Sequence, residues 1–259
     1  MTDLTYGIQS IWHQDNDLQM ACLDAIVKDV RHIQDSEIQR LQAAYLKKIG
    51  AFYVFKGEYL VDHFGNLITD PMYGAFSQFK TCYLHERLAL PLRIADGSVL
   101  GFVGYSNKPA DWPEDKSWVK YFYPGSETFS KGRYMFIEPD EIRKAIQEQY
   151  ICIVDGLFDK IILQCLGINA VSLCGSSLTD WHQRYLNFVK YKIVIADNDI
   201  AGRKLFNACL WRLSNVVEIR QPKTNDIDDY LKTPQRLANF LQVFNEMQQE
   251  GFVNSKELK

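Results

Sequence analysis

Acidic side chains occur in three short motifs in the second half of the chain, each where a strand is expected to end. The motifs are Asp155-Gly-Leu-Phe-Asp159, Asp197-Asn-Asp199 and Asp226-Ile-Asp228-Asp229. The first two follow apolar runs, residues 150–154 and 191–196, which are typical of buried parallel strands. Because ligands of open α/β sheets bind outside the carboxyl ends of the strands, we expect at least four carboxylates to meet at one edge of a sheet.

Carboxylates that converge in this way favour a bound cation. Like charges at close range cannot all stay ionised unless their pKa values rise or a cation lies between them. Mg²⁺ prefers carboxylate oxygens and substrate phosphates, so the pattern indicates metal-dependent phosphoryl-transfer chemistry. The simpler alternative is that Asp155 caps a helix, Asp159 complements its dipole and the third motif is a solvated turn.

The composition is that of a soluble globular protein. The 259 residues are 47% hydrophobic and 24% charged, with a formal net charge of −3, so the chain is not a basic nucleic-acid coat. No apolar stretch reaches the ~18 residues of a membrane span. The six cysteines form no C-x-x-C pair, which predicts no zinc in this chain and reduced thiols in a cytoplasmic protein.

Strands and helices are expected to alternate from residue 150 onward. This alternation predicts a mostly parallel, Rossmann-like α/β sheet with right-handed crossovers. A helix over 232–250 and a frayed tail over 251–259 should follow. The expected strands are 151–154, 170–173, 193–196 and 216–220, and the expected helices are 158–166, 180–189 and 201–213.

The first half of the chain is expected to be a smaller α+β region with a mainly antiparallel sheet. Residues 106–133 contain several prolines and little periodicity, so they predict a long loop. The expected helices are 17–27 and 35–46, the strands are 51–55, 59–63 and 88–93, and a hairpin over 94–104 turns at Asp96-Gly97.

Basic and aromatic residues are interleaved within this loop. Basic side chains bind phosphates, and aromatic rings stack on unpaired bases, so the segment suits a nucleic-acid strand. The alternative is that the rings form a local core and the basic groups are solvated. The residues are Lys116, Lys120, Lys131, Arg133, Tyr121, Phe122 and Tyr123.

The segment Leu173-Cys-Gly-Ser-Ser-Leu-Thr179 predicts a tight loop after a strand. Its backbone N–H groups could approach a phosphate near the acidic edge. It could equally be an ordinary loop with Thr179 or Asp180 as the N-cap of the next helix.

Four motifs in order resemble the Toprim domain of bacterial-type primases, topoisomerases and some nucleases. They are D-G-x-x-D at 155–159, the glycine-containing segment 167–179, D-N-D-x-A-G-R at 197–203 and N-D-I-D-D-Y-L at 225–231. The family normally begins the first motif with Glu, whereas this chain has Asp155, which keeps the carboxylate on a side chain one methylene shorter.

The segments before the Toprim-like region resemble the RNA polymerase domain of DnaG-type primases. These segments are Arg87–Arg93, Asp96–Gly104, Lys120–Thr128 and Phe129–Gly132, and they occur in the family's order. Tyr105 stands where the family commonly has Arg, and Tyr123 where it commonly has Asn. These departures suggest a phage or mobile-element version of the family.

The resemblance implies a DNA primase, a nucleotidyltransferase that synthesises short RNA primers on single-stranded DNA for replication. It implies two or more Mg²⁺ or Mn²⁺ ions and no zinc in this chain. The implied catalytic residues are Asp155, Asp159, Asp197 and Asp199. The implied metal ligands are Asp155, Asp197, Asp199, Asp226 and Asp228. The implied nucleic-acid or NTP contacts are Arg87, Arg93, Lys120, Lys131, Arg133 and Arg203.

The implied partners are a single-stranded DNA template, NTPs, a replicative helicase and a separate zinc-binding or template-recognition protein, with no membrane. The implied location is the cytoplasm of a bacterial or phage-infected cell. Two alternatives stay open, a Toprim nuclease that uses the same metals and a catalytically impaired accessory subunit. The expected domains are a helical segment 1–50, an α+β subdomain 51–145, a Toprim domain 146–231 and a C-terminal helix and tail 232–259.

Overall fold

The computed structural model divides into two compact units, each of which is described by itself. Within the described residues, one unit lies in 43–129 and the other comprises 36–42 and 130–258. Among these residues no helix is long and apolar enough to cross a membrane. The expected helix 17–27 and strand 59–63 lie outside the part described, which is 36–54, 75–76, 81–82, 84, 87–94, 96–106, 119–124, 129–222 and 227–258.

The first unit contains a four-stranded sheet with the strand order β1-β4-β5-β6. Strands β4 and β5 form an antiparallel hairpin that turns at the expected place, although its first strand is the expected strand 88–93 rather than part of 94–104. Gly97 in this turn has a φ of 90°, which suits glycine. Residues 43–48 of helix α3 belong to this unit and precede the sheet, and a separate two-stranded pair, β2 and β3, completes the unit's described elements. The bounds are α3 Ser36–Lys48, β1 Phe52–Val54, β2 Ala75–Phe76, β3 Thr81–Cys82, β4 Arg87–Arg93, β5 Val99–Tyr105 and β6 Tyr121–Phe122.

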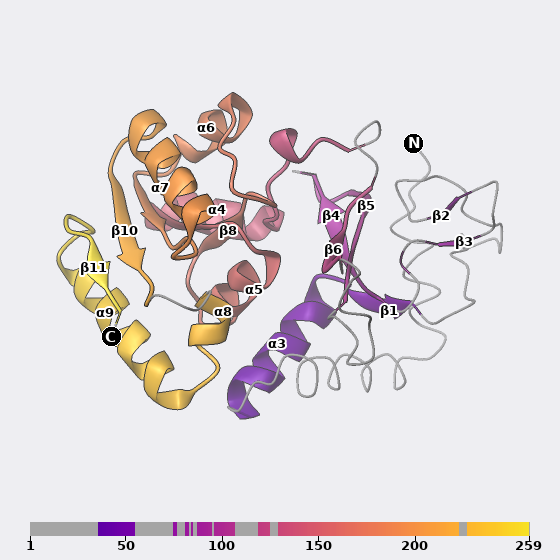
Figure 1. Ribbon diagram of the computed structural model, residues 1–259, viewed down its shortest axis with the longest axis horizontal. Coiled ribbons are helices and arrows are strands. Elements are labelled where there is room, and N and C mark those ends of the chain that lie inside the picture. Colours follow the sequence, from indigo (N-terminus) through magenta and orange to yellow (C-terminus); the bar gives the residue numbers. More distant parts are fainter. Residues whose placement is uncertain are drawn as a thin grey trace. The chain divides into compact units, whose positions relative to one another are not determined.

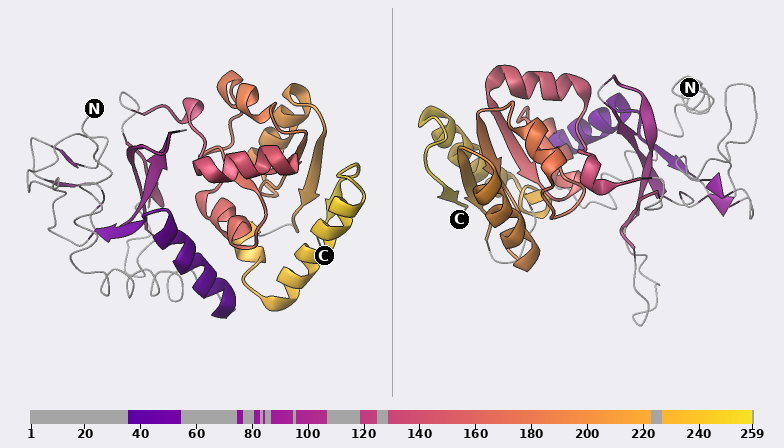
Figure 2. Two further views of the ribbon diagram at one scale, coloured as in Figure 1. Left: turned by 180° about the vertical axis from the view of Figure 1, so that it is seen from behind. Right: turned by 90° about the horizontal axis from the view of Figure 1, so that it is seen from above.

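The second unit contains the expected parallel sheet, with the strand order β11-β10-β9-β7-β8. Helices α4 and α7 lie on opposite faces of this sheet (Figures 1 and 2). The strands are β7 Tyr150–Val154, β8 Ala170–Ser172, β9 Tyr191–Val194, β10 Val216–Arg220 and β11 Lys256–Glu257. The helices are α4 Pro139–Glu148, α5 Leu157–Cys165, α6 Asp180–Leu186, α7 Ile200–Arg212, α8 Ile227–Tyr230 and α9 Pro234–Gln249.

Both faces of this sheet are apolar, as the continuous Val/Ile runs predict. On β7, Ile151 and Ile153 join a core cluster with Leu186 of α6 and Leu205 of α7. The ring of Tyr150, on the alternate face, contacts Phe244 of α9 and Phe252 at centroid distances of 5.7 and 5.3 Å. The carboxyl end of the sheet is therefore a rigid platform for the residues that follow β7 and β9.

Helix α4 was missed by the sequence prediction, although its beginning carries a clear local signal. Glu138 and Glu141 form a capping box, and Pro139 occupies the first turn, where its missing N–H costs nothing. Strand β6 was also missed, because the expected loop 106–133 contains two residues, Tyr121 and Phe122, that pair with β5. Pairing with a distant strand leaves no periodic signal in so short a segment.

The frayed tail predicted for 251–259 is wrong. Strand β11 pairs in parallel with β10, and Leu258 donates its backbone N–H to Arg220 O at 2.9 Å. The Phe252 ring is buried against Tyr150, Tyr191 and Phe244. The tail thus forms an edge of the sheet and covers part of its apolar face.

We expect Phe252→Ala to destabilise the protein by about 3–5 kcal/mol, the usual cost of truncating a buried phenylalanine. Urea unfolding would measure this change. Val253→Ala is the matched control, because Val253 is 70% exposed and its truncation should change the stability little. Equal, small effects of the two variants would mean that the tail does not pack on the sheet.

Candidate metal centre

Three carboxylates gather at the carboxyl end of the parallel sheet. Asp155, Asp159 and Asp197 each offer one oxygen, and these oxygens lie within 4.8 Å of one another. Asp159 is buried and the other two are half-buried. Three hard oxygen donors in partly dry surroundings fit a divalent cation such as Mg²⁺ or Mn²⁺.

The turn from β7 into α5 positions two of these carboxylates. Asp155 directly follows β7, and its backbone oxygen accepts a hydrogen bond from the Ser172 hydroxyl of β8 at 2.8 Å. The N-cap of α5 is Gly156, so the alternative in which Asp155 caps this helix is wrong. A Cβ atom at position 156 would lie 2.0 Å from Asp159 Oδ2, so only glycine lets this carboxylate fold back over the turn.

The turn from β9 into α7 positions the third carboxylate in the same way. A Cβ atom at Gly202 would lie 1.9 Å from the backbone oxygen of Asp197. Asp199 is the N-cap of α7 and accepts a hydrogen bond from Gly202 N at 2.8 Å. The two acids of the D-x-D motif therefore differ, since Asp197 joins the three-carboxylate group and Asp199 starts the helix.

Gln221 braces this turn from the end of β10. Its amide nitrogen donates to Ala196 O at 3.1 Å, and its backbone oxygen accepts from the Asn198 amide at 2.9 Å. Gln221 is buried. It carries no motif signal, so the sequence could not have identified it as support for Asp197.

A buried ion pair lies directly beside Asp159 in the sequence. Lys160 Nζ is 2.6 Å from Glu141 Oε2, and both side chains are almost completely buried. Burial lowers the pKa of Lys160, while Glu141 opposes this shift. Removing one partner of such a buried pair typically lowers the stability of a protein by ~3–5 kcal/mol, because the other charge is left buried and unpaired. The contact therefore holds α5 against α4. The sequence pattern did not predict this pair, because it did not predict α4.

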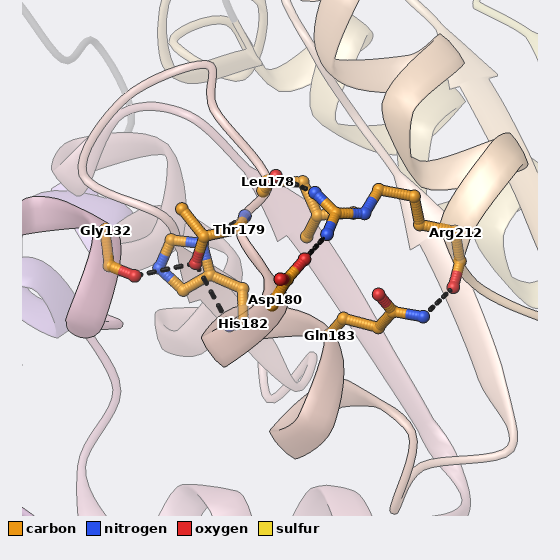
Figure 3. A network of polar contacts seen from close by, with 7 residues as sticks. All are labelled: Gly132, Leu178, Thr179, Asp180, His182, Gln183 and Arg212. Carbon is orange, nitrogen blue, oxygen red and sulfur yellow. Dashed lines mark hydrogen bonds and ion pairs between the residues drawn. The ribbon is translucent and has the colours of Figure 1, made fainter.

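The loop 173–179 is fastened to the basic turn Lys131–Arg133, as Figure 3 shows. The Thr179 hydroxyl donates to Gly132 O at 2.6 Å. His182 accepts from Thr179 N at its Nδ1 atom, 3.2 Å away, and its Nε2 lies 2.8 Å from Tyr134 O. Thr179 is also the N-cap of α6, which decides between the two N-cap candidates.

Arg212 fastens the same loop to the end of α7 (Figure 3). Its guanidinium donates to Leu178 O at 2.7 Å and pairs with Asp180. Gln183 Nε2 in turn donates to Arg212 O at 2.7 Å. The loop after β8 is therefore held at both sides by side chains of the second unit.

The basic turn leaves two cations at the surface of the second unit. Lys131 and Arg133 are exposed, and a Cβ atom at Gly132 between them would lie 3.1 Å from the Thr179 methyl group. Partial burial lowers the pKa of Lys131, and nearby Cys174, in the loop after β8, opposes the shift. The turn thus lies beside a loop at the carboxyl end of the sheet.

Two predicted nucleic-acid contacts have their guanidinium donors engaged inside the first unit. Arg87 is buried, donates to Val119 O at 2.9 Å and lies 4.9 Å from the Phe122 ring centroid. Arg93 donates to Gly97 O at 2.8 Å and to Ile49 O at 3.1 Å. Both therefore support the sheet and its hairpin.

The aromatic residues beside Lys120 divide into two kinds. Tyr121 contacts Tyr105 and Tyr123 stacks on Phe129, as the local-core alternative expects. Phe122 is 39% exposed, and Lys120 is also at the surface. One ring and one cation of the predicted pattern thus remain accessible on the first unit.

The remaining predicted residues fall in several places. Arg203 donates to Asn198 Oδ1 at 3.1 Å, and among the residues that the structure describes it pairs with no carboxylate. Asp228 lies on α8, but its side chain is outside the part of the structure that is described. Asp226 and Lys116 also lie outside that part.

Residues 152–231 match the family model described as Toprim-like. The match covers the three-carboxylate group, both glycine turns and the loop after β8. This part of the chain is therefore similar to a Toprim-like domain, as its four motifs predict.

The resemblance to DnaG-type DNA primases is also confirmed. The chain is 31% identical over 155 residues to the DNA primase of Aquifex aeolicus, covering 57% of this chain and 30% of that protein. It is 29% identical over 158 residues to the DNA primase of Enterococcus faecalis, covering 57% and 25%. The chain thus spans less than a third of the length of these relatives.

The fold matches that of the RNA polymerase domain of Mycobacterium tuberculosis primase DnaG, solved with a double-stranded DNA oligomer with a 6-nucleotide overhang. The TM-score is 0.67 at 19% sequence identity, and the match covers 93% of this chain and 77% of the other. The expected fold class, a Toprim domain combined with an α+β region, is therefore confirmed.

We expect Gly202→Ala to destabilise the protein by roughly 1–3 kcal/mol, the usual cost of overpacking, because its Cβ atom would collide with the Asp197 backbone. Urea unfolding would measure this change. Asn207→Ala, on the exposed face of the same helix, should change stability by less than ~0.5 kcal/mol. Unchanged stability of Gly202→Ala would contradict the close approach of α7 to Asp197.

We also expect His182 to make folding stability depend on pH. Burial lowers the pKa of His182, while the hydrogen bond to Tyr134 O opposes this shift. The unfolded chain therefore takes up this proton first, so the contribution is complete above about pH 6.5 and is lost as pH falls through the folded-state pKa. Urea unfolding between about pH 7.5 and 5.5 should show a shallower pH dependence for His182→Gln than for the wild type. Identical slopes would contradict this assignment.

Proposed function

We propose that this chain contains the catalytic part of a DNA primase, which synthesises short RNA primers on single-stranded DNA. The observation that carries the proposal is the group of three carboxylates, Asp155, Asp159 and Asp197, at the strand ends of a Toprim-like domain. Relatives named DNA primase, and the DnaG fold that includes the first unit, favour primer synthesis among the Toprim activities.

The three carboxylates would hold Mg²⁺ or Mn²⁺. Such an ion neutralises developing phosphate charge and makes a bound hydroxyl more acidic. The protein's own contribution is geometry, because two glycine turns, the Gln221 brace and the buried Lys160–Glu141 pair fix the donors before any ligand arrives. Asp199, Asp226 and Asp228 would extend this group toward a second ion.

The basic turn would bind phosphate groups of an NTP or of the template. Lys131 and Arg133 are exposed cations, and the Thr179 and His182 contacts fix the backbone that carries them. Cations carried on a fixed backbone in this position would stabilise charge on a transferring phosphoryl group. On the first unit, Lys120 and Phe122 would offer one cation and one ring to single-stranded DNA.

The other predicted basic residues would act less directly. Arg87 and Arg93 would support the first unit's sheet through the backbone carbonyls they contact. Arg203 would approach a phosphate from the beginning of α7. The DNA in the M. tuberculosis DnaG complex supports a DNA template as partner. NTPs, a replicative helicase and a separate zinc-binding or template-recognition protein complete the proposed partners.

Primer synthesis tests the proposal directly. The protein would be incubated with single-stranded DNA, labelled NTPs and Mg²⁺ or Mn²⁺, and short labelled RNA should form. Asp197→Asn should reduce this product by more than about 100-fold, because it removes one charge from the three-carboxylate group. Asp140→Asn, an exposed acid at the beginning of α4, is the matched control and should retain activity.

The alternatives would give different products in the same assay. Metal-dependent degradation of the template, also lost in Asp197→Asn, would indicate a Toprim nuclease. Absence of both RNA products and degradation, even with a helicase and a zinc-binding partner added, would contradict the proposal and favour an accessory subunit.

A further inference from the structure

The outer face of α7 carries an exposed stripe that the metal centre does not use. Ile200, Lys204, Asn207 and Trp211 recur at helical spacing and fall on one face at 3.6 residues per turn. All four are exposed, and Trp211 is 89% exposed. A tryptophan so fully in water loses the burial that usually stabilises this side chain, which suggests that a ligand covers it.

The charge of α7 indicates the kind of ligand. The helix contains Arg203, Lys204 and Arg212 and no acidic residue, within a chain of net charge −3. Arg212 is engaged with Asp180 and Leu178 O, whereas Arg203 and Lys204 are exposed near the beginning of the helix. A face with cations at one end and a large ring at the other complements an anionic ligand with flat, stackable groups.

The stripe is continuous with the metal centre. Helix α7 begins directly after Asp199, its N-cap, and Gly202 lies against the backbone of Asp197. Lys204 and Trp211 are separated by seven residues, which is about 10 Å along the helix axis at a rise of ~1.5 Å per residue. A chain-like ligand that leaves the three-carboxylate group can therefore run along this face.

We infer that the outer face of α7 binds a single strand of nucleic acid. Trp211 stacks on an unpaired base, Lys204 and Arg203 bind phosphates, and the Asn207 amide hydrogen-bonds a base edge or the backbone. A cation and an amide between the two apolar residues suit a strand better than an apolar partner helix. The inference rests on the proposed function, since the nucleic acid that reaches the metal centre would have a second binding surface on the same unit.

Binding of a fluorescently labelled oligothymidylate in EDTA tests the inference, because no metal is then needed at the acidic centre. Trp211→Ala should weaken binding between about five- and 150-fold, the range that corresponds to ~1–3 kcal/mol per stacked base, while Trp211→Phe should retain most of the affinity. Lys204→Glu should weaken binding and reduce its salt dependence. Phe188→Ala, an aromatic residue that is 67% exposed outside this face, should bind like the wild type.

Three results would overturn the inference. Wild-type affinity in both Trp211→Ala and Lys204→Glu would mean that no strand lies on α7. Equal losses in Phe188→Ala and Trp211→Ala would mean that exposed rings bind without a defined site. A wild-type dimer that Trp211→Ala converts to a monomer, with unchanged oligonucleotide affinity, would make the face a protein interface.

The proposed function can fail separately. Absence of primer synthesis by the wild type would contradict the primase proposal, while the metal-free affinities would still decide whether α7 binds a strand. Conversely, primer synthesis by the wild type together with wild-type affinity in both Trp211→Ala and Lys204→Glu would overturn only the inference. Because Trp211 is exposed, thermal unfolding of Trp211→Ala should match the wild type, which separates binding loss from misfolding.

Discussion

Repulsion among three carboxylates is the constraint on which the rest of the second unit depends. Oxygens of Asp155, Asp159 and Asp197 lie within 4.8 Å of one another, and one of the three side chains is buried. At this spacing each ionised pair costs about 3–4 kcal/mol at an effective dielectric constant of ~20. The sheet, the two glycine turns and the buried Lys160–Glu141 pair must hold the acids together against that cost, and a divalent cation would offset it.

The same platform fixes the chemistry around the acids. Asp155 and Asp197 follow neighbouring parallel strands, so the pairing of β7 with β9 sets their separation. The loop after β8 is tied to the basic turn through Thr179 and His182, and to α7 through Arg212. Acids, cations and the beginning of α7 are consequently parts of one rigid unit, which is the preorganisation that phosphoryl transfer requires.

The sequence predicted the parallel sheet and its acidic edge well, because Val/Ile runs followed by acids need no long-range information. It also predicted the hairpin at Asp96-Gly97 from local turn chemistry. It did not predict strands that form only through pairing with a strand far away in the sequence. These are β6, which pairs with β5, and β11, which pairs with β10. The local pattern also could not show that Asp197 joins the three-carboxylate group while Asp199 does not. This difference arises because Asp199 is the N-cap of α7. Helix α4 was predictable from its capping box, and with it the partner of Lys160.

Direct measurement of Mn²⁺ binding tests the central claim, that Asp155, Asp159 and Asp197 form a divalent-metal centre. Electron paramagnetic resonance of free Mn²⁺, or calorimetric titration, would give the affinity in the absence of nucleotide and DNA. The wild type should bind Mn²⁺ with displacement by Mg²⁺, and Asp159→Asn should weaken binding at least tenfold while the exposed-site variant Asp140→Asn does not. Equal Mn²⁺ affinity in the wild type and Asp159→Asn would contradict the claim.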